Sequence, residues 1–355
     1  MNKPILASIL SCQTTELTDR EKYLFEKFNP LGISLFKRNI ETKDKLKKLV
    51  DEIKNVINRD DVLIAIDEEG GRVSRISHIN NNKYVSQDIL GKNDIKYTIA
   101  HAELTAMDLH IYGINVNYSP VADIKDNSLS EVLKTRCFSD NPDKVKQYAK
   151  AMADTYIKMG ICPCIKHIPG HFSSPKDPHL EVLESNLNKD DIDKQIEYLE
   201  FIANYPLAMT SHIKLNNIDD KNPTTVSKKV ITNIIREKLQ FDGFLLSDAI
   251  DMKALSENIV KKHNNALDAG VDATCYCSGN IEELERICNE KRFMTEKSLN
   301  RFENIKKVIH NPCEKIDVEA QRSLYNHGLN KWFDEIYLYD ATEVLHHMQK
   351  KGENL

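Results

Sequence analysis

Three segments of the chain place ionisable side chains directly after short apolar runs. The first, DEEGGRVSR at residues 67–75, joins three carboxylates to a Gly-Gly turn and two arginines. Carboxylates suit pairs of sugar hydroxyls, and the arginine fork suits an acceptor that takes two parallel hydrogen bonds. The segment is therefore a candidate ligand-binding turn, and an ion-paired turn on the protein surface is the alternative.

The second segment, KHIPGHFSSPKDPH at residues 166–179, is a turn-rich loop with three histidines after a buried strand. Asp177 and His179 stand two residues apart, so the carboxylate can orient the imidazole and raise its basicity. A histidine held in this way suits proton transfer near neutral pH. A solvent loop with ordinary histidines is the alternative. No fixed pattern of acidic ligands accompanies the histidines, so we expect no metal site.

The third segment, FDGFLLSDAIDM at residues 241–252, is an almost wholly apolar strand that ends at Asp248. A carboxylate at this point can attack the anomeric carbon of a sugar or stabilise a cation, as glycoside hydrolysis requires. The alternative is that Asp248 caps the N-terminus of the helix that follows.

Eight apolar runs predict the strands that would carry these side chains at their ends. They are residues 6–11, 33–36, 62–66, 115–118, 163–167, 208–212, 243–247 and 272–275. Amphipathic stretches between them predict helices at residues 18–28, 42–58, 95–112, 142–159, 190–204, 228–239, 258–269 and 281–290. Gly32, Gly113, Gly160 and Gly270 each separate a predicted helix from the next strand, where a helix C-terminus favours glycine.

Eight strand–helix alternations predict a parallel (β/α)8 barrel, in which the polar strand ends gather on one rim. An open doubly wound sheet is the alternative, but no segment resembles G-x-G-x-x-G or a P-loop. Residues 295–310 predict one more helix, and the charged tail after it predicts helices at residues 318–326 and 341–350. We therefore expect a barrel domain at residues 1–310 and a helical extension at residues 311–355, whose role the sequence does not indicate.

The composition is that of a soluble globular protein. Among 355 residues, 49 are Lys or Arg and 54 are Asp or Glu, which gives a formal charge of −5. This balance offers no basic surface for nucleic acid or membrane lipids, so neither is an expected partner. The apolar run at residues 4–12 is too short and too poor in basic residues for a signal peptide. Eight cysteines in a chain of 355 residues are too sparse for a disulfide scaffold and are typical of buried apolar thiols in a reducing compartment. We therefore expect a cytoplasmic protein.

The three segments resemble the family 3 glycoside hydrolases, specifically the single-domain β-N-acetylhexosaminidases of the NagZ type. The family pattern D-[QE]-E-G-G-R-V-x-R matches residues 67–75, and K-H-[FI]-P-G-H followed by D-x-H matches residues 166–171 and 177–179. The pattern F-D-G-x-x-x-[ST]-D-x-[LMI]-x-M matches residues 241–252. Weaker matches are LFKRN at residues 35–39, NYSPVAD at residues 117–123 and RCFS at residues 136–139.

The resemblance implies a retaining exo-glycosidase that removes terminal β-linked N-acetylglucosamine from muropeptide fragments released during cell-wall turnover. It implies Asp248 as the nucleophile and His179 as the general acid/base, with Asp177 as its partner. It assigns sugar binding to Asp67, Arg75, Arg136, Lys166 and His167. No metal or organic cofactor is implied, the partner is a small glycan, and we expect a monomer or a weak homo-oligomer.

Two departures from the family pattern and two competing functions stay open. Pro178 replaces the usual Ser of the D-x-H motif and restricts the backbone on both sides, which would stiffen the loop. Ala249 stands where many relatives carry a second Asp. A β-glucosidase-like activity is one competitor, although those enzymes usually carry a second domain that supplies the acid/base. A catalytically silent sugar-binding barrel is the other, and the intact Asp248 and His179 argue against it.

Overall fold

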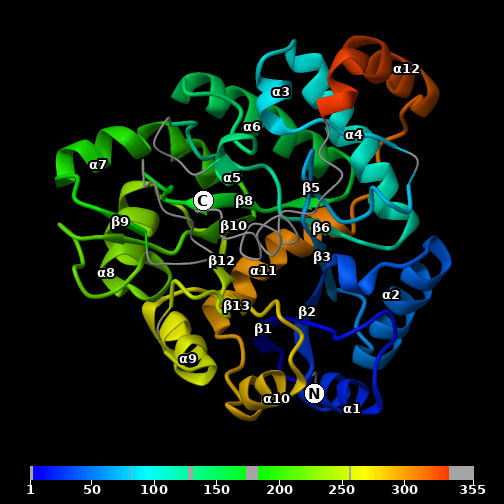
Figure 1. The fold of residues 1–355 in the computed structure, drawn as a ribbon. Helices are drawn as coiled ribbons and strands as arrows, with labels where there is room; N and C mark the ends of the chain where they lie inside the picture. The colour runs from blue at the N-terminus through cyan, green and yellow to red at the C-terminus, as the bar shows by residue number, and fades with distance from the viewer. Residues whose placement is uncertain (1–2, 81, 127–130, 173–182, 256, 336–355) are drawn as a thin grey trace, which may run out of the picture.

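The computed structural model describes residues 3–80, 82–126, 131–172, 183–255 and 257–335. At its centre lies a sheet of nine parallel strands with helices around it (Figure 1). The strands pair in the order β7-β6-β3-β2-β1-β13-β12-β10-β8. Their bounds are β1 Leu6–Ser11, β2 Pro30–Leu35, β3 Leu63–Ile66, β6 Val116–Asn117, β7 Cys162–Pro163, β8 Ile165–Ile168, β10 Leu207–Thr210, β12 Phe244–Ala249 and β13 Ala273–Cys275.

The two ends of this sheet meet in one stretch of chain. β7 and β8 are separated only by Cys164, and β7 pairs with β6 while β8 pairs with β10. With β7 and β8 taken as one interrupted strand, eight strands follow one another around the ring in sequence order. The predicted (β/α)8 barrel is therefore confirmed, in a nearly closed form.

Most of the predicted helices that fall within the described residues are confirmed, with boundaries that shift by one or two residues and by three at the end of α12. They are α1 Asp19–Phe28, α2 Lys43–Ile57, α4 Ile95–Ile111, α6 Pro142–Lys158, α7 Lys189–Ile196, α9 Ile259–Ala269, α10 Ile281–Asn289, α11 Glu296–Ile309 and α12 Val318–Leu329. Polar side chains cap the N-termini of these helices; on α1, for example, Thr18 and Glu21 form a capping box. The range 190–204 ends as a 3₁₀-helix, η2 Glu197–Asn204, and the range 228–239 splits into α8 Lys228–Val230 and a π-helix, η4 Ile231–Lys238.

Short elements complete the described chain, and several of them lie in the connections between strands. They are β4 Glu68–Gly70, β5 Val73–Ser74, β9 Leu183–Ser185, β11 Ile213–Leu215, α3 Gln87–Gly91, α5 Glu131–Lys134, η1 Lys37–Asn39, η3 Thr224–Val226 and η5 Asn330–Glu335. The helix predicted at residues 341–350 lies outside the described residues. The division into a domain at residues 1–310 and an extension stays a prediction.

Alternate strand residues fill the barrel interior. This inner cluster includes Ala7 and Ile9 of β1 and Phe244 and Leu246 of β12, all at most 2% exposed. Helix α11 closes the amino ends of the strands, because its apolar face joins the same cluster. Packed apolar side chains therefore fill the barrel toward the amino ends of its strands, and the polar groups lie at the carboxyl ends.

Three of the four glycines expected after helices adopt the left-handed conformation, with φ of 69° at Gly113, 74° at Gly160 and 115° at Gly270. The prediction for Gly32 is wrong, because this residue lies inside β2. Asn29, with φ of 53°, ends α1 in its place. A Cβ on Gly32 would stand 2.2 Å from the Leu63 carbonyl oxygen, so glycine is needed there for the close approach of β2 and β3.

All eight cysteines are free thiols, and six of them are buried. Cys162 and Cys164 pack inside the barrel, as expected of small apolar residues. Among the described residues, no helix combines the length and apolarity that crossing a bilayer requires.

Candidate active site

A cavity of about 580 Å³ lies at the carboxyl ends of the barrel strands. This volume is typical of small-molecule sites. Six of the residues that the sequence singled out line it: Asp67, Arg75, Arg136, Lys166, His167 and Asp248. Asp177 and His179 lie outside the described residues, so their positions relative to the cavity stay a prediction.

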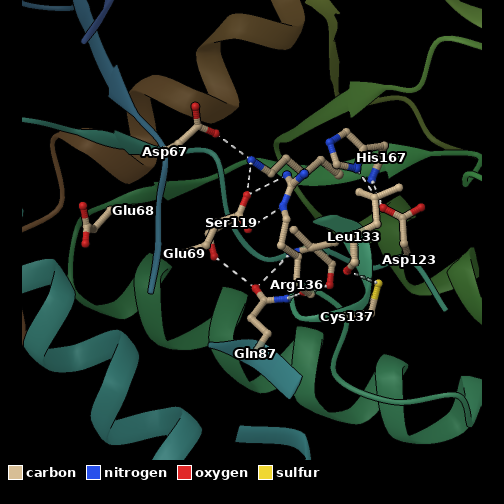
Figure 2. Close-up of polar contacts among 12 residues, drawn as sticks. Asp67, Glu68, Glu69, Gln87, Ser119, Asp123, Leu133, Arg136, Cys137 and His167 are labelled. Carbon is tan, nitrogen blue, oxygen red and sulfur yellow. Dashed lines mark hydrogen bonds and ion pairs between the residues drawn. The ribbon is translucent and has the colours of Figure 1, made fainter. Parts of the chain in front are cut away.

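Asp67, Arg136 and Lys166 line one wall of the cavity, and Glu69 joins them in a continuous network of charges. Figure 2 shows Asp67, Glu69 and Arg136 of this network. Lys166 Nζ lies 2.6 Å from an oxygen of Asp67 and 2.6 Å from an oxygen of Glu69. Arg136 donates two hydrogen bonds of 2.9 Å to the two oxygens of Glu69. Glu69 thus fixes both cations, and Asp67, whose side chain is 18% exposed, faces the cavity.

The charges of this network stabilise one another. Burial alone would raise the pKa of Asp67, but the charges of Lys166 and Arg75 outweigh burial and hold that pKa well below its usual range. Burial likewise opposes ionisation of Glu69, and Arg136 and Lys166 lower its pKa. The carboxylates in turn raise the pKa of Lys166 and of Arg136 against the effect of burial. The wall therefore keeps fixed charges at neutral pH and is preorganised to bind hydroxyl groups.

The hairpin of β4 and β5 carries Arg75 to the cavity, and Glu68 holds this hairpin. The Glu68 carboxylate accepts hydrogen bonds from the backbone N–H groups of Arg75, at 2.8 Å, and Ile76, at 3.2 Å, and from the Ser74 hydroxyl. Burial raises the pKa of Glu68 to about 7. In Figure 2 the Glu68 side chain points away from the cluster of Arg136 and Glu69, so its role is structural. Arg75 Nη2 lies 3.5 Å from Asp67.

Asp123 holds two histidines on the adjoining wall. One of its oxygens lies 2.7 Å from His167 Nδ1, and the other lies 3.0 Å from His171 Nδ1. Burial opposes ionisation of Asp123, but the two histidines outweigh burial and lower its pKa. An ionised carboxylate only accepts hydrogen bonds, so both Nδ1 atoms carry the hydrogen. Burial lowers the pKa of His167 to about 4, so its ring is neutral and its Nε2 can accept a hydroxyl hydrogen.

Asp123, His167 and His171 also have the chemistry of metal ligands, and their donor atoms lie within 4.8 Å of one another. The distances of 2.7 and 3.0 Å between Asp123 and the two rings are those of ordinary hydrogen bonds. Each Asp123 oxygen already has a ring partner in this arrangement. The expectation that the protein needs no metal stays a prediction.

Asp248 lies on β12, across the barrel from β3. Its backbone N–H donates to Thr210 Oγ1 at 3.2 Å, and its carboxylate accepts the Ala249 N–H at 2.7 Å. His212 Nε2 lies 2.9 Å from the Ala249 carbonyl oxygen, and this contact fixes the end of the strand. The interpretation of Asp248 as a helix cap is wrong, since Asn258 caps the next helix, α9.

Burial decides how the turn at residues 67–75 and the histidine loop are to be interpreted. The interpretation of residues 67–75 as an ion-paired turn on the protein surface is wrong, because Glu68 and Glu69 are each 1% exposed. Within the described part of the histidine loop, His167 and His171 are buried, which is not expected of a solvent loop.

Three residues of the two walls have roles that the sequence did not indicate. They are Glu69, Asp123 and His171, and each of them lies inside a matched motif. Their partners come from other strands and connections, as where Glu69 pairs with Arg136. The motifs therefore contained the signal for these residues, but the roles depend on contacts between distant parts of the chain.

Comparison with known proteins agrees with this geometry. The model of the glycosyl hydrolase family 3 N-terminal domain matches residues 10–308. A protein named beta-hexosaminidase from Shewanella frigidimarina is 32% identical over 262 residues, which cover 70% of this chain and 75% of the relative. Beta-hexosaminidase A from Pseudoalteromonas piscicida is 28% identical over 284 residues, which cover 73% of this chain. The chain spans only 47% of the length of that second relative.

A solved structure has the same fold. NagZ from Neisseria gonorrhoeae, in complex with N-trifluoroacetyl-D-glucosamine, superposes with a TM-score of 0.78 and 23% identity. The superposition covers 91% of this chain and 98% of that one. The chain belongs to glycosyl hydrolase family 3.

Proposed function

We propose that this protein is a retaining exo-β-N-acetylglucosaminidase that removes terminal β-linked N-acetylglucosamine from muropeptide fragments. One observation carries the proposal: a single cavity joins Asp248 to buried, charge-paired side chains suited to sugar hydroxyls. The names of the hexosaminidase relatives support the choice of sugar. The muropeptide substrate is proposed from the likeness to the NagZ type.

In the proposed first step, an oxygen of Asp248 attacks the anomeric carbon of the bound sugar. The bond from this carbon to the leaving oxygen breaks, and His179 donates a proton to that oxygen. The product is a glycosyl ester of Asp248. In the second step, His179 takes a proton from water while the water oxygen attacks the same carbon and releases Asp248, so two inversions retain the configuration.

Besides Asp248, four described residues of the cavity have a task in this scheme. Asp67 accepts sugar hydroxyl hydrogens, and Lys166 and Arg136 donate to sugar oxygens. The neutral ring of His167 accepts a further hydroxyl through Nε2. Holding the sugar at several hydroxyls places its anomeric carbon against Asp248, and this orientation lowers the barrier to attack.

The free thiols of all eight cysteines support a reducing compartment, and we place the reaction in the cytoplasm. A secreted protein of this length would more often use its cysteines in disulfides. Fractionation of the native host cells, followed by immunodetection, tests this location.

The experiment that tests the activity compares 4-nitrophenyl N-acetyl-β-D-glucosaminide with the corresponding β-glucoside. We expect hydrolysis of the first and little of the second. Proton NMR of the first-formed product should show the β-anomer, and an α-anomer would overturn the retaining mechanism. Preference for the glucoside would favour a β-glucosidase-like activity, and hydrolysis of neither would favour a silent sugar-binding barrel.

The substitution His179→Ala tests the acid/base role. Substrates with good leaving groups need little protonation, so their glycosylation should be spared relative to substrates with poor leaving groups. Equal losses on both classes, measured as kcat/KM, would contradict the role. Release of N-acetylglucosamine from a disaccharide ending in anhydro-N-acetylmuramic acid, measured beside chitobiose, tests the muropeptide substrate.

A further inference from the structure

Helix α12 lies beyond residues 10–308, the part of the chain that matches the family model. It packs against α4, as Figure 1 shows for the orange helix beside the cyan one. On its inner face Tyr325 is fully buried, with 0% of its surface exposed. Burial of a tyrosine ring contributes to docking of the helix, but its hydroxyl must also find polar partners.

The Tyr325 hydroxyl contacts two different parts of the barrel. The Val85 backbone N–H donates to it at 2.9 Å, and His101 Nδ1 lies 3.0 Å away. Because the oxygen already accepts from Val85, its own hydrogen can be donated to His101. The rings of Tyr84, His101 and Tyr325 pack together, with centroids 5.2 to 5.9 Å apart.

Both partners of Tyr325 press against Gly70, the residue next to Glu69. A Cβ on Gly70 would lie 2.4 Å from the Val85 carbonyl oxygen and 2.7 Å from His101 Cε1. The Gly71 N–H donates to the Tyr84 carbonyl oxygen at 2.8 Å. Tyr325 therefore contacts Val85 and His101, and these two residues pack against the turn that carries the Glu69 carboxylate.

The same segment reaches the second cation of the cavity. Gln87 follows Val85 by two residues, and its side-chain amide donates to the Arg136 carbonyl oxygen at 2.6 Å. Gln87 also donates to the Val121 carbonyl oxygen at 3.1 Å and accepts from the Val121 N–H at 3.1 Å. Residues 84–87 thus connect Tyr325 to the backbone of Arg136, while Gly70 connects it to Glu69.

We infer that Tyr325 is a positioning residue for sugar binding: its hydroxyl fixes residues 84–87 and His101, which in turn hold Glu69 and Arg136 in place. The inference rests on the proposed function and gives the C-terminal segment a part in it. Tyr325 does not touch the cavity, so the effect is on placement of the binding groups and not on the chemical step.

The test uses the full chain with Tyr325→Phe, which keeps the ring and removes the hydroxyl. We expect KM for the N-acetylglucosaminide, and the inhibition constant of N-acetylglucosamine, to rise about three- to tenfold, with kcat within about twofold. Leu329→Ala is the matched control, because Leu329 is buried on the same helix but apolar. It should lower the melting temperature and leave KM within about twofold.

Trp332, the single tryptophan, lies just beyond α12 and reports on docking. Its emission should be the same in Tyr325→Phe as in the unchanged protein if the helix stays docked. Should Tyr325→Phe fail to fold, His101→Asn perturbs the same path from α4 and should raise KM similarly. In a folded double variant the two effects should not add, because they act through one connection.

Three results would overturn the inference. One is an unchanged KM in both Tyr325→Phe and His101→Asn. Another is an equal rise of KM in Leu329→Ala, which would assign the effect to helix docking in general. The third is a complete lack of activity in the protein without substitutions, which would remove the proposed function as well. An active protein with an unchanged KM in the variants would remove only this inference.

Discussion

Buried ion pairs occupy both ends of the barrel, and they differ in what surrounds them. At the amino ends of the strands, Asp272 contacts Arg236 at 2.8 Å and Arg301 at 3.0 Å. It also accepts from the Ser298 hydroxyl and the Leu245 N–H, each at 2.8 Å. At the carboxyl ends, Asp67, Glu69, Lys166 and Arg136 form a similar network, but beside a cavity of about 580 Å³.

The difference shows that charge pairing alone does not mark a functional site. Asp272 has protein partners for both oxygens, and α11, which supplies Arg301, covers this end of the barrel. The network at the other end faces a hollow large enough for a sugar. The amino-end cluster should therefore determine stability, and the carboxyl-end cluster should determine binding and catalysis.

The largest expected effect is at the carboxyl end, with Asp248→Ala. Loss of the proposed nucleophile should lower kcat by roughly 10³-fold or more while the melting temperature changes little. The measurement is hydrolysis of the chromogenic substrate beside thermal unfolding. Azide, a small anion that fits the vacated space, should restore part of the turnover and yield an α-glycosyl azide. Substantial activity without azide would remove Asp248 as the nucleophile.

The next effect is at the amino end, with Arg301→Met. The change leaves buried Asp272 with one cation fewer, so the free energy of unfolding should fall by about 3 kcal/mol. Denaturant unfolding measures it, and kcat/KM below the melting temperature should stay within about twofold. Arg292→Met is the control, since its pair with Asp268 is exposed and should contribute less than about 1 kcal/mol. A selective loss of activity in Arg301→Met would break the contrast between the two ends.

A smaller effect is expected for Asp67→Asn in the cavity. The variant keeps the shape of the side chain but loses the charge, while Lys166 keeps its pair with Glu69. Sugar hydroxyls would lose a charged acceptor, so KM should rise roughly tenfold to a hundredfold with little loss of stability. Steady-state kinetics and thermal unfolding measure both. A large loss of stability with an unchanged KM would show that Asp67 has a structural role and does not bind the sugar.

The smallest effect on activity is expected for Glu68, a carboxyl-end residue with a structural role. Its pKa is raised in the folded protein from 4.5 to about 7, so the folded state disfavours its ionised form. This group should therefore make the free energy of unfolding fall as pH rises from 4.5 through about 7. In Glu68→Gln that part of the slope, roughly 3 kcal/mol for a shift from 4.5 to about 7, should be absent. Denaturant titrations at pH 5 and pH 7.5 compare the two proteins, and identical slopes would contradict the assignment.

Much of the fold was predictable from local patterns. The strand predicted at residues 6–11 is β1 as observed, and the helix predicted from residue 142 is α6, which begins at Pro142 with Asn141 as its cap. The prediction that Gly32 ends a helix was wrong, because a glycine that caps a helix and a glycine that allows two strands to approach have the same sequence signal. Residues 231–238 were predicted as an α-helix and form a π-helix, a difference that periodicity does not resolve.

The candidate site was predictable as a set of residues but not as an arrangement. The barrel, the motifs after its strands and the chemistry that Asp67, Lys166 and Asp248 can perform were all predictable, because periodicity and residue type are local properties of the sequence. Packing of the folded chain was needed to show that Glu69 joins Lys166 to Arg136, that Asp123 contacts two histidines, and that Tyr325 of α12 contacts Val85 and His101 behind the site. These contacts join residues up to 240 positions apart, as between Val85 and Tyr325, and such distances are set by packing of the whole chain.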